Sequence, residues 1–114
     1  MDDDLRHGTF DPDAIFRTLE NAAEAWLSAK ETADNLTELK KTMLARYTLD
    51  AMKSSKSRIE AEMVALADPA YEEYLRGMNA AERVANRAKA KFDNMKILSE
   101  LRRSEESSRR SLSR

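Results

Sequence analysis

The sequence predicts an all-α protein, a long helical hairpin of coiled-coil character. Glycine and proline are scarce, at two residues each in 114, and 36% of the residues are charged. The chain is rich in strong helix formers such as Ala, Leu, Met, Glu, Lys and Arg. Its apolar residues recur at alternating steps of four and three, which is the period of a helix face that packs against another helix.

The first expected helix covers residues 11–67 and follows a flexible acidic segment at 1–10. In "FDPDAIF", Asp11 is suited to cap the helix and Pro12 to occupy its first position. The polar segment "KSSKSR" interrupts the apolar pattern of this span. We therefore expect either one continuous helix or two helices divided near 50–57. The apolar seam consists of Ile15, Leu19, Ala22, Trp26, Ala29, Ala33, Leu36, Met43 and Tyr47, and after a slip in register it resumes with Met52, Ile59, Met63 and Leu66.

The second expected helix is basic, covers residues 68–103 and begins in nearly the same way. In "ADPAYEE", Asp68 is the cap, and Pro69 ends the first helix near Ala67 because it disfavours helical geometry at the preceding residue. Gly77 predicts tight packing or a bend. Residues 104–114 are rich in Ser and Arg and are expected to form a frayed helix end or a disordered arm. The seam continues through Tyr71, Tyr74, Met78, Ala81, Ala85, Ala88, Phe92 and Met95.

The amount of apolar material predicts an oligomer. Only six aromatic residues accompany Trp26, so a single compact core would be thin. Long helices with thin cores usually complete their burial against another copy or a partner. The residues expected to form this oligomer seam are Leu19, Trp26, Leu36, Met43, Tyr47, Tyr74, Met78, Phe92 and Met95.

Several classes of chemistry lack their residues. The chain has no cysteine, and His7 is its single histidine. No glycine-rich phosphate loop, metal-ligand spacing or nucleophilic triad can be assembled, so we expect neither an enzyme nor a cofactor or metal. No apolar run approaches the roughly 20 residues that span a bilayer, and "MDDDLRHGTF" lacks the apolar stretch of a secretory signal. We therefore expect a cytoplasmic protein with no membrane partner.

The net charge of −1 conceals a marked polarity. Residues 1–50 hold eleven acidic and six basic side chains, whereas residues 83–114 hold four acidic and ten basic ones. Such asymmetry predicts a basic arm for nucleic acid or an acidic partner, or head-to-tail contact between copies. Chance segregation of charge on a solvated helix is the competing interpretation.

Part of this basic charge falls on one face of the second helix. At about 100° per residue, Arg76, Arg83, Arg87 and Lys91 lie opposite the seam, over about 22 Å, with no carboxylate among them. Such a row can follow a nucleic-acid backbone, although a solvated or salt-bridged face explains it nearly as well. We expect nearby acids to pair with Lys96. Lys89 is also expected to be matched by a nearby acid, and Trp26 is assigned to packing rather than base stacking. The candidate nucleic-acid-binding residues are Arg76, Arg83, Arg87, Lys89 and Lys91, with Lys53, Lys56 and Arg58 as a second cluster.

The segment "ADPAYEEYLRGMNAAERVANRAKAKFDNMK", followed by a tail ending in "RR", resembles small helical bacteriophage proteins of recombination and replication modules. The layout is also similar to that of phage recombination mediator proteins. This resemblance implies a helical oligomer that binds single-stranded DNA and helps to load a recombinase over single-strand-binding protein, in a phage-infected bacterial host. The residues it assigns to DNA are Arg83, Arg87, Lys89 and Lys91.

Two other classes remain open. A small helical hairpin can serve as a protein-interaction module, such as a phage-encoded inhibitor or a scaffold subunit, acting through its acidic first half. A secreted hairpin of the WXG type has a similar length, but the Trp-x-Gly turn is replaced here by "LADPAY". No base-reading group is identifiable, so the sequence does not distinguish DNA from RNA.

Overall fold

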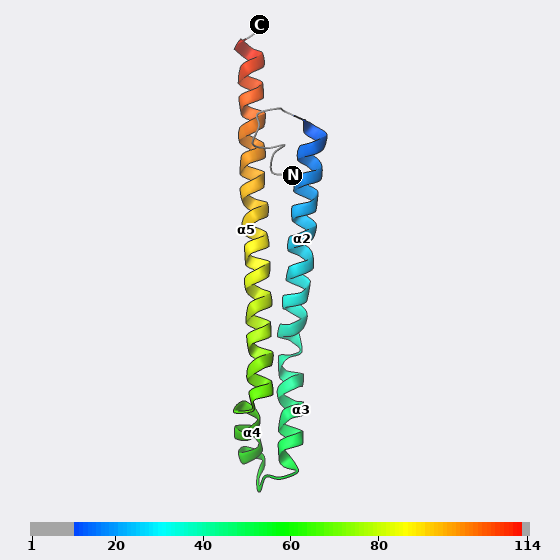
Figure 1. The fold of residues 1–114 in the computed structure, drawn as a ribbon, viewed down its shortest axis with the longest axis vertical. Coiled ribbons are helices and arrows are strands. Elements are labelled where there is room, and N and C mark those ends of the chain that lie inside the picture. Colours follow the sequence, from blue (N-terminus) through cyan, green and yellow to red (C-terminus); the bar gives the residue numbers. More distant parts are fainter. Residues whose placement is uncertain (1–10, 113–114) are drawn as a thin grey trace. The chain divides into compact units, whose positions relative to one another are not determined.

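The computed structural model describes residues 11–112, which form four helices and no strand (Figure 1). The helices are α2 (Pro12–Glu38), α3 (Lys40–Met52), α4 (Arg58–Leu66) and α5 (Pro69–Leu112). The predicted all-α class is therefore confirmed. The acidic segment predicted to be flexible, residues 1–10, lies outside the described residues.

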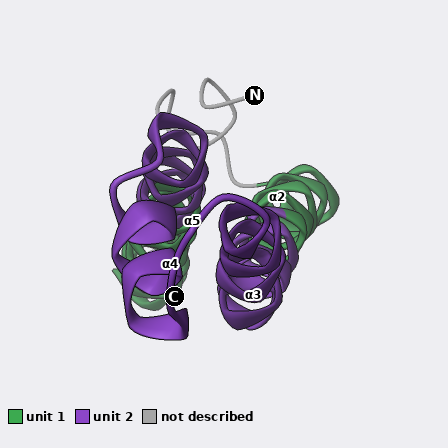
Figure 2. Cartoon of the chain, turned by 90° about the horizontal axis from the view of Figure 1, so that it is seen from below, with its two compact units in different colours: residues 1–28, 85–114 green, residues 29–84 purple. Residues whose placement is uncertain are grey.

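The chain divides into two compact units, each an antiparallel arrangement of helices (Figure 2). In the first unit, the part of α2 up to Ser28 lies beside the part of α5 from Ala85 onward. In the second unit, residues 29–84, the end of α2 is joined by α3, α4 and the beginning of α5. Helices α2 and α5 thus contribute to both units.

The two predicted Asp-Pro helix starts are confirmed. Asp11 Oδ1 accepts hydrogen bonds from the backbone amides two and three residues later, at 3.1 and 3.2 Å. Asp68 Oδ1 accepts one from the amide two residues later, at 2.8 Å. In each case the carboxylate satisfies backbone N–H groups that have no partner within the helix, and the proline takes the first helical position.

The first predicted helix is divided, as one of the two alternatives proposed. Residues 53–57 form a turn between α3 and α4. Ser55 Oγ donates to the carbonyl oxygen of Ala51 at 2.7 Å, and Ser57 Oγ accepts from the amide of Glu60 at 3.1 Å. The serines of "KSSKSR" therefore satisfy backbone groups at the end of one helix and the start of the next.

The seam predicted up to Tyr47 and along the second helix faces inward. In the first unit, the rings of Trp26 and Phe92 are stacked, with centroids 5.9 Å apart and an interplanar angle of 22°. In the second unit, Tyr47 and Tyr71 make an edge contact at 6.0 Å. These contacts join helices of one chain, so the seam is already occupied within a single copy, and oligomerisation stays a prediction. All seam residues on these stretches are buried or half-buried, the fully buried ones being Ile15, Ala22, Ala33, Tyr71 and Ala85.

The predicted continuation of the seam beyond Tyr47 is wrong. Met52, Ile59, Met63 and Leu66 are between 46% and 72% exposed, and the buried residues of α3 and α4 are alanines instead. In α3 the seam continues four residues after Tyr47 with Ala51, and Met52 is the next residue and points outward. Beyond α3, the turn at 53–57 resets the helical register, which a continuous count of residues does not follow. The alanines turned inward are Ala51, Ala61 and Ala65, with exposures of 8%, 0% and 1%. Their small size suits helices that lie close together, as α3 and α4 do.

A further break, which the sequence did not predict, separates α2 from α3 at Leu39. The last carbonyl groups of a helix have no partner within it. Here the amide of Leu39 bonds to the Asn35 carbonyl oxygen at 3.1 Å, and the hydroxyl of Tyr74 donates to that of Leu36. The half-buried Tyr74 thus ties α5 to the end of α2 within the second unit.

Helix α5 is longer than expected, since it continues to Leu112 and passes the boundary predicted at residue 103. Its last turn contains Arg109 and Arg110, and cations are favourable at the negative end of a helix dipole. Arg109 also lies 3.5 Å from the carboxylate of Glu106. The Ser/Arg-rich segment is therefore helical up to this point.

Gly77 lies inside α5 without tight packing, which was one of the two alternatives that the sequence offered, the other being a bend. A Cβ atom placed there would have no neighbour within 4 Å beyond its own helix backbone. Gly77→Ala is therefore expected to raise the free energy of unfolding by about 1 kcal/mol. Glycine loses more conformational entropy than alanine when a helix forms, and no close contact at this position requires its small size. Urea unfolding followed by circular dichroism measures this, with Ala80→Gly on the exposed side of the same helix as the converse control. An unchanged or lowered stability of Gly77→Ala would show that the glycine has another purpose.

Candidate nucleic-acid interface

Three basic residues on successive turns of α5 form the core of the candidate site. Arg83, Arg87 and Lys91 are exposed, and none forms an ion pair with a carboxylate of residues 11–112. Arg83 belongs to the second unit, and Arg87 and Lys91 to the first. A spacing of four residues rises about 6 Å along a helix and keeps side chains on one face. We call these three residues the α5 row.

Arg76, which the sequence placed in the same row, is not free of carboxylates. Its Nη2 lies 2.6 Å from Glu72 Oε1, one turn earlier on α5. Both side chains are exposed, so the pair is worth little stability. A phosphate that approached Arg76 would nevertheless have to displace an acid already in place.

The second predicted basic cluster is also largely paired. Lys53 Nζ lies 3.4 Å from Asp50, and Arg58 Nε lies 3.3 Å from Glu62. Lys56 is exposed and, within the part of the chain that the structure describes, forms no ion pair. This cluster therefore presents much less uncompensated charge than its sequence suggested.

The two lysines nearest the seam lie against aromatic rings. Lys96 Nζ is 4.0 Å from Asp93, which confirms the predicted pairing, and 5.1 Å from the centre of the Phe92 ring. Lys89, which we expected to be matched by an acid, instead lies with its Nζ 5.9 Å from the centre of the Trp26 ring. An ammonium within about 6 Å of a ring is attracted to its face. Lys89 is exposed, but its ammonium lies beside the Trp26 ring, and it is not counted in the α5 row.

Lys91 borders a small hollow that the sequence did not reveal. The hollow has a volume of about 180 Å³ and lies between α2 and α5 in the first unit. On the α2 side, the lining consists of the small side chains Ala22 and Ala25 together with the polar residues Thr18 and Asn21. The Thr18 hydroxyl itself donates to the Ala14 carbonyl oxygen at 3.0 Å. The hollow therefore gives Lys91 a largely apolar margin on one side.

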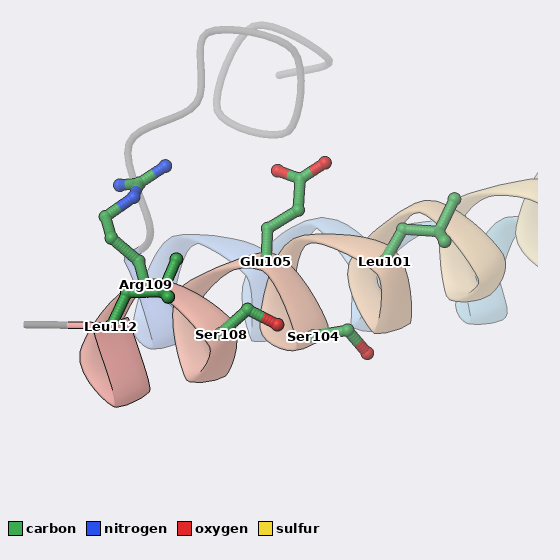
Figure 3. Close-up of a pocket in the computed structure, with 6 residues that line it drawn as sticks. All are labelled: Leu101, Ser104, Glu105, Ser108, Arg109 and Leu112. Atoms are coloured by element: carbon green, nitrogen blue, oxygen red, sulfur yellow. The ribbon is translucent and has the colours of Figure 1, made fainter.

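A second hollow, near the C-terminal end of α5, is formed by one helix alone (Figure 3). Glu105 and Arg109 point to the same side of it, and Ser104 to another. Among the described residues, no other element contributes to its lining. The full lining is Leu101, Ser104, Glu105, Ser108, Arg109 and Leu112.

Residues 11–112 contain neither a metal-binding cluster nor a membrane-spanning helix. No group of three or more His, Cys, Asp and Glu side chains is arranged to hold a metal ion there. His7 lies outside the described residues. None of the described helices combines the length and the apolar composition needed to cross a membrane.

Comparison with known proteins found no matching family model, no matching curated protein and no matching solved structure. The similarity in layout to phage recombination mediator proteins therefore stays a hypothesis. Function has to be argued from the side chains themselves.

Proposed function

We propose that this protein is a non-enzymatic accessory protein of DNA recombination or replication that holds single-stranded DNA along the α5 row. The observation that carries the proposal is the contrast in pairing between basic residues. Arg83, Arg87 and Lys91 are exposed without an acidic partner among the described residues, whereas Arg58 and Arg76 each face a carboxylate.

The physical basis is phosphate neutralisation. Each cation that meets a phosphate releases condensed counterions, and this release supplies most of the sequence-independent affinity for nucleic acid. Arg87 and Lys91, four residues apart in the first unit, offer two charges separated by about 6 Å along the helix, and Arg83 of the second unit adds a third. Three contacts give only weak binding by one copy, and several copies on one strand would bind more tightly through multivalency.

The α5 row contains no aromatic side chain, so the proposed contact depends on the phosphate backbone alone. Single-strand binders often add aromatic platforms to a basic groove. Here Trp26 and Phe92 stack on each other, and Tyr71 is 3% exposed, so these rings serve packing. The proposal is therefore one of backbone binding, with a recombinase or a single-strand-binding protein as the partner class that a mediator would also contact.

The test is binding of a fluorescein-labelled oligothymidine, measured by anisotropy over a salt series. Arg83→Ala/Arg87→Ala/Lys91→Ala should bind at least about tenfold more weakly than the parent at low salt. Its plot of log affinity against log salt should be less steep by about 2, because each phosphate contact on a single strand contributes about 0.7.

A matched control removes the same charge from paired positions. Lys53→Ala/Arg58→Ala/Arg76→Ala also loses three positive charges, and these side chains lie near acids in the structure. This variant should keep most of the parent's affinity. Absence of binding by the parent at low salt, or equal weakening of both variants, would contradict the proposal. Competition by oligouridine then decides between DNA and RNA.

A second candidate function, a protein-interaction module, is favoured by one observation. The outer faces of α3 and α4 carry large apolar side chains at high exposure, including Ile59 and Met63 at 72% and 67%. Exposed apolar surface of this kind is typical of sites where another protein binds. The two functions are compatible, since this surface does not include the α5 row.

A further inference from the structure

A groove between α3 and α4 has an apolar floor with charge at its edges. Its volume is about 580 Å³, which is larger than that of either hollow described above. Leu49, Met52 and Leu66 line it and are 66%, 46% and 58% exposed. The complete lining is Lys41, Leu44, Ala45, Thr48, Leu49 and Met52 from α3, with Arg58, Glu62 and Leu66 from α4.

The groove lies on the outer side of a hairpin whose small residues are turned inward, and Leu66 is the large apolar residue that α4 contributes to it. Ala61 and Ala65 are turned inward, so the large apolar residues of α4 are left on the outside. The α3 side of the groove follows one helical stripe, since its residues are spaced by three and four. An amphipathic helix that lays its apolar face into such a groove is a common mode of recognition.

The chain itself contains a helix face of matching length. Phe16 and Leu27 on the outer side of α2 are 66% and 56% exposed. They are eleven residues apart, which is close to three turns, so they share one face and lie about 16 Å from each other along the axis. Lys41 and Met52, at the two ends of the α3 stripe, are also eleven positions apart, so the stripe has the same length.

The charges of the two surfaces are complementary. Helix α2 carries six acidic and two basic residues, whereas residues 40–66 carry six basic and three acidic ones. Glu20 and Glu24 lie on the flank of the Phe16–Leu27 face, are exposed, and form no ion pair within residues 11–112. Lys41 in the groove likewise has no acidic partner among these residues.

We propose that a second copy of this chain lays the Phe16–Leu27 face of its α2 into the α3–α4 groove. The two apolar side chains cover the groove floor, and Glu20 and Glu24 meet the positive charge of Lys41. The contact joins two different surfaces, so it either closes into a ring or continues from copy to copy. It differs from the seam expected from the sequence, whose side chains pack within one chain.

The first test is the molar mass in solution, measured by light scattering over a range of concentrations. The parent should rise above the 13.0 kDa of one copy as its concentration increases. Leu49→Lys/Leu66→Lys in the groove and Leu27→Lys on α2 should each remain at one copy. Val84→Lys is the matched control, because Val84 is 54% exposed and lies outside both surfaces, and it should behave as the parent.

The second test exchanges the charges across the contact. Lys41→Glu alone and Glu20→Lys/Glu24→Lys alone should each weaken self-association by about tenfold or more. An equimolar mixture of the two variants should associate as the parent does, because opposite charges meet again. All of these positions are exposed, and circular dichroism verifies that the variants are folded.

Three results would overturn the inference. They are a parent that stays at one copy at every concentration, association that survives Leu49→Lys/Leu66→Lys, and a mixture that fails to restore association. The variant of the α5 row, Arg83→Ala/Arg87→Ala/Lys91→Ala, should associate normally. Failure of DNA binding and failure of self-association are therefore distinguished in the same set of proteins.

Discussion

Trp26→Ala is expected to lower the free energy of unfolding by about 3 kcal/mol, the largest effect of any single substitution considered for this protein. Removing a large aromatic side chain from a packed site costs about 3 to 5 kcal/mol, and Trp26 is half-buried, which favours the lower figure. Its ring is stacked on Phe92 and has Lys89 above it. Urea unfolding followed by circular dichroism measures the loss.

A double-mutant cycle identifies the source of this loss. If the stacking with Phe92 carries part of the stability, Trp26→Ala and Phe92→Ala combined should cost about 1 kcal/mol less than the sum of the two single changes. Trp26→Phe keeps an aromatic ring against Phe92 and should cost clearly less than Trp26→Ala. A loss below about 1 kcal/mol in Trp26→Ala would show that the first unit does not depend on this contact.

Ala61→Leu is expected to destabilise the protein by about 2 kcal/mol. Ala61 is completely buried in α4, and added methyl groups in a filled interior force neighbouring helices apart. Thermal unfolding followed by circular dichroism should show a lower midpoint than that of the parent. Leucine is nearly as good a helix former as alanine, so the intrinsic propensity of α4 changes little.

Ala80→Leu provides the matched control, since Ala80 is exposed on α5 within the same unit. It should change the free energy of unfolding by no more than about 0.5 kcal/mol. Equal effects at the two positions would contradict the inward placement of α4's alanines.

The helix starts and the seam were predictable because local rules determine them. Aspartate is favoured at the cap and proline at the first helical position, and Asp11 and Asp68 both act as caps. The four-three spacing identified the packed faces as far as Tyr47 in the first half and Met95 in the second, including the stacked pair Trp26 and Phe92.

The seam prediction failed where the chain turns. Between α3 and α4 the register is reset at residues 53–57, and a periodic count has no means of measuring that rotation. The expectation that large apolar residues lie inside then favoured Ile59 and Met63 over Ala61 and Ala65. The structure reverses this order, because closely spaced helices accept alanine and exclude larger side chains.

The composition of the candidate site was only partly predictable. The exposure of Arg83, Arg87 and Lys91 agrees with the helical spacing in the sequence. The pairing of Arg76 with Glu72 had a signal, since an acid four residues before a base is a favourable spacing on a helix. The position of Lys89 over Trp26 had none, because it depends on how α2 and α5 pack in the first unit.

The most direct test of the proposed function is the ratio of two affinities for the same single-stranded oligonucleotide, measured at one low salt concentration. The numerator is the dissociation constant of Arg83→Ala/Arg87→Ala/Lys91→Ala, and the denominator is that of Lys53→Ala/Arg58→Ala/Arg76→Ala. Both variants lose three positive charges, so the ratio reports position and not net charge. The α5 row predicts a ratio of about ten or more. A ratio close to one would contradict it.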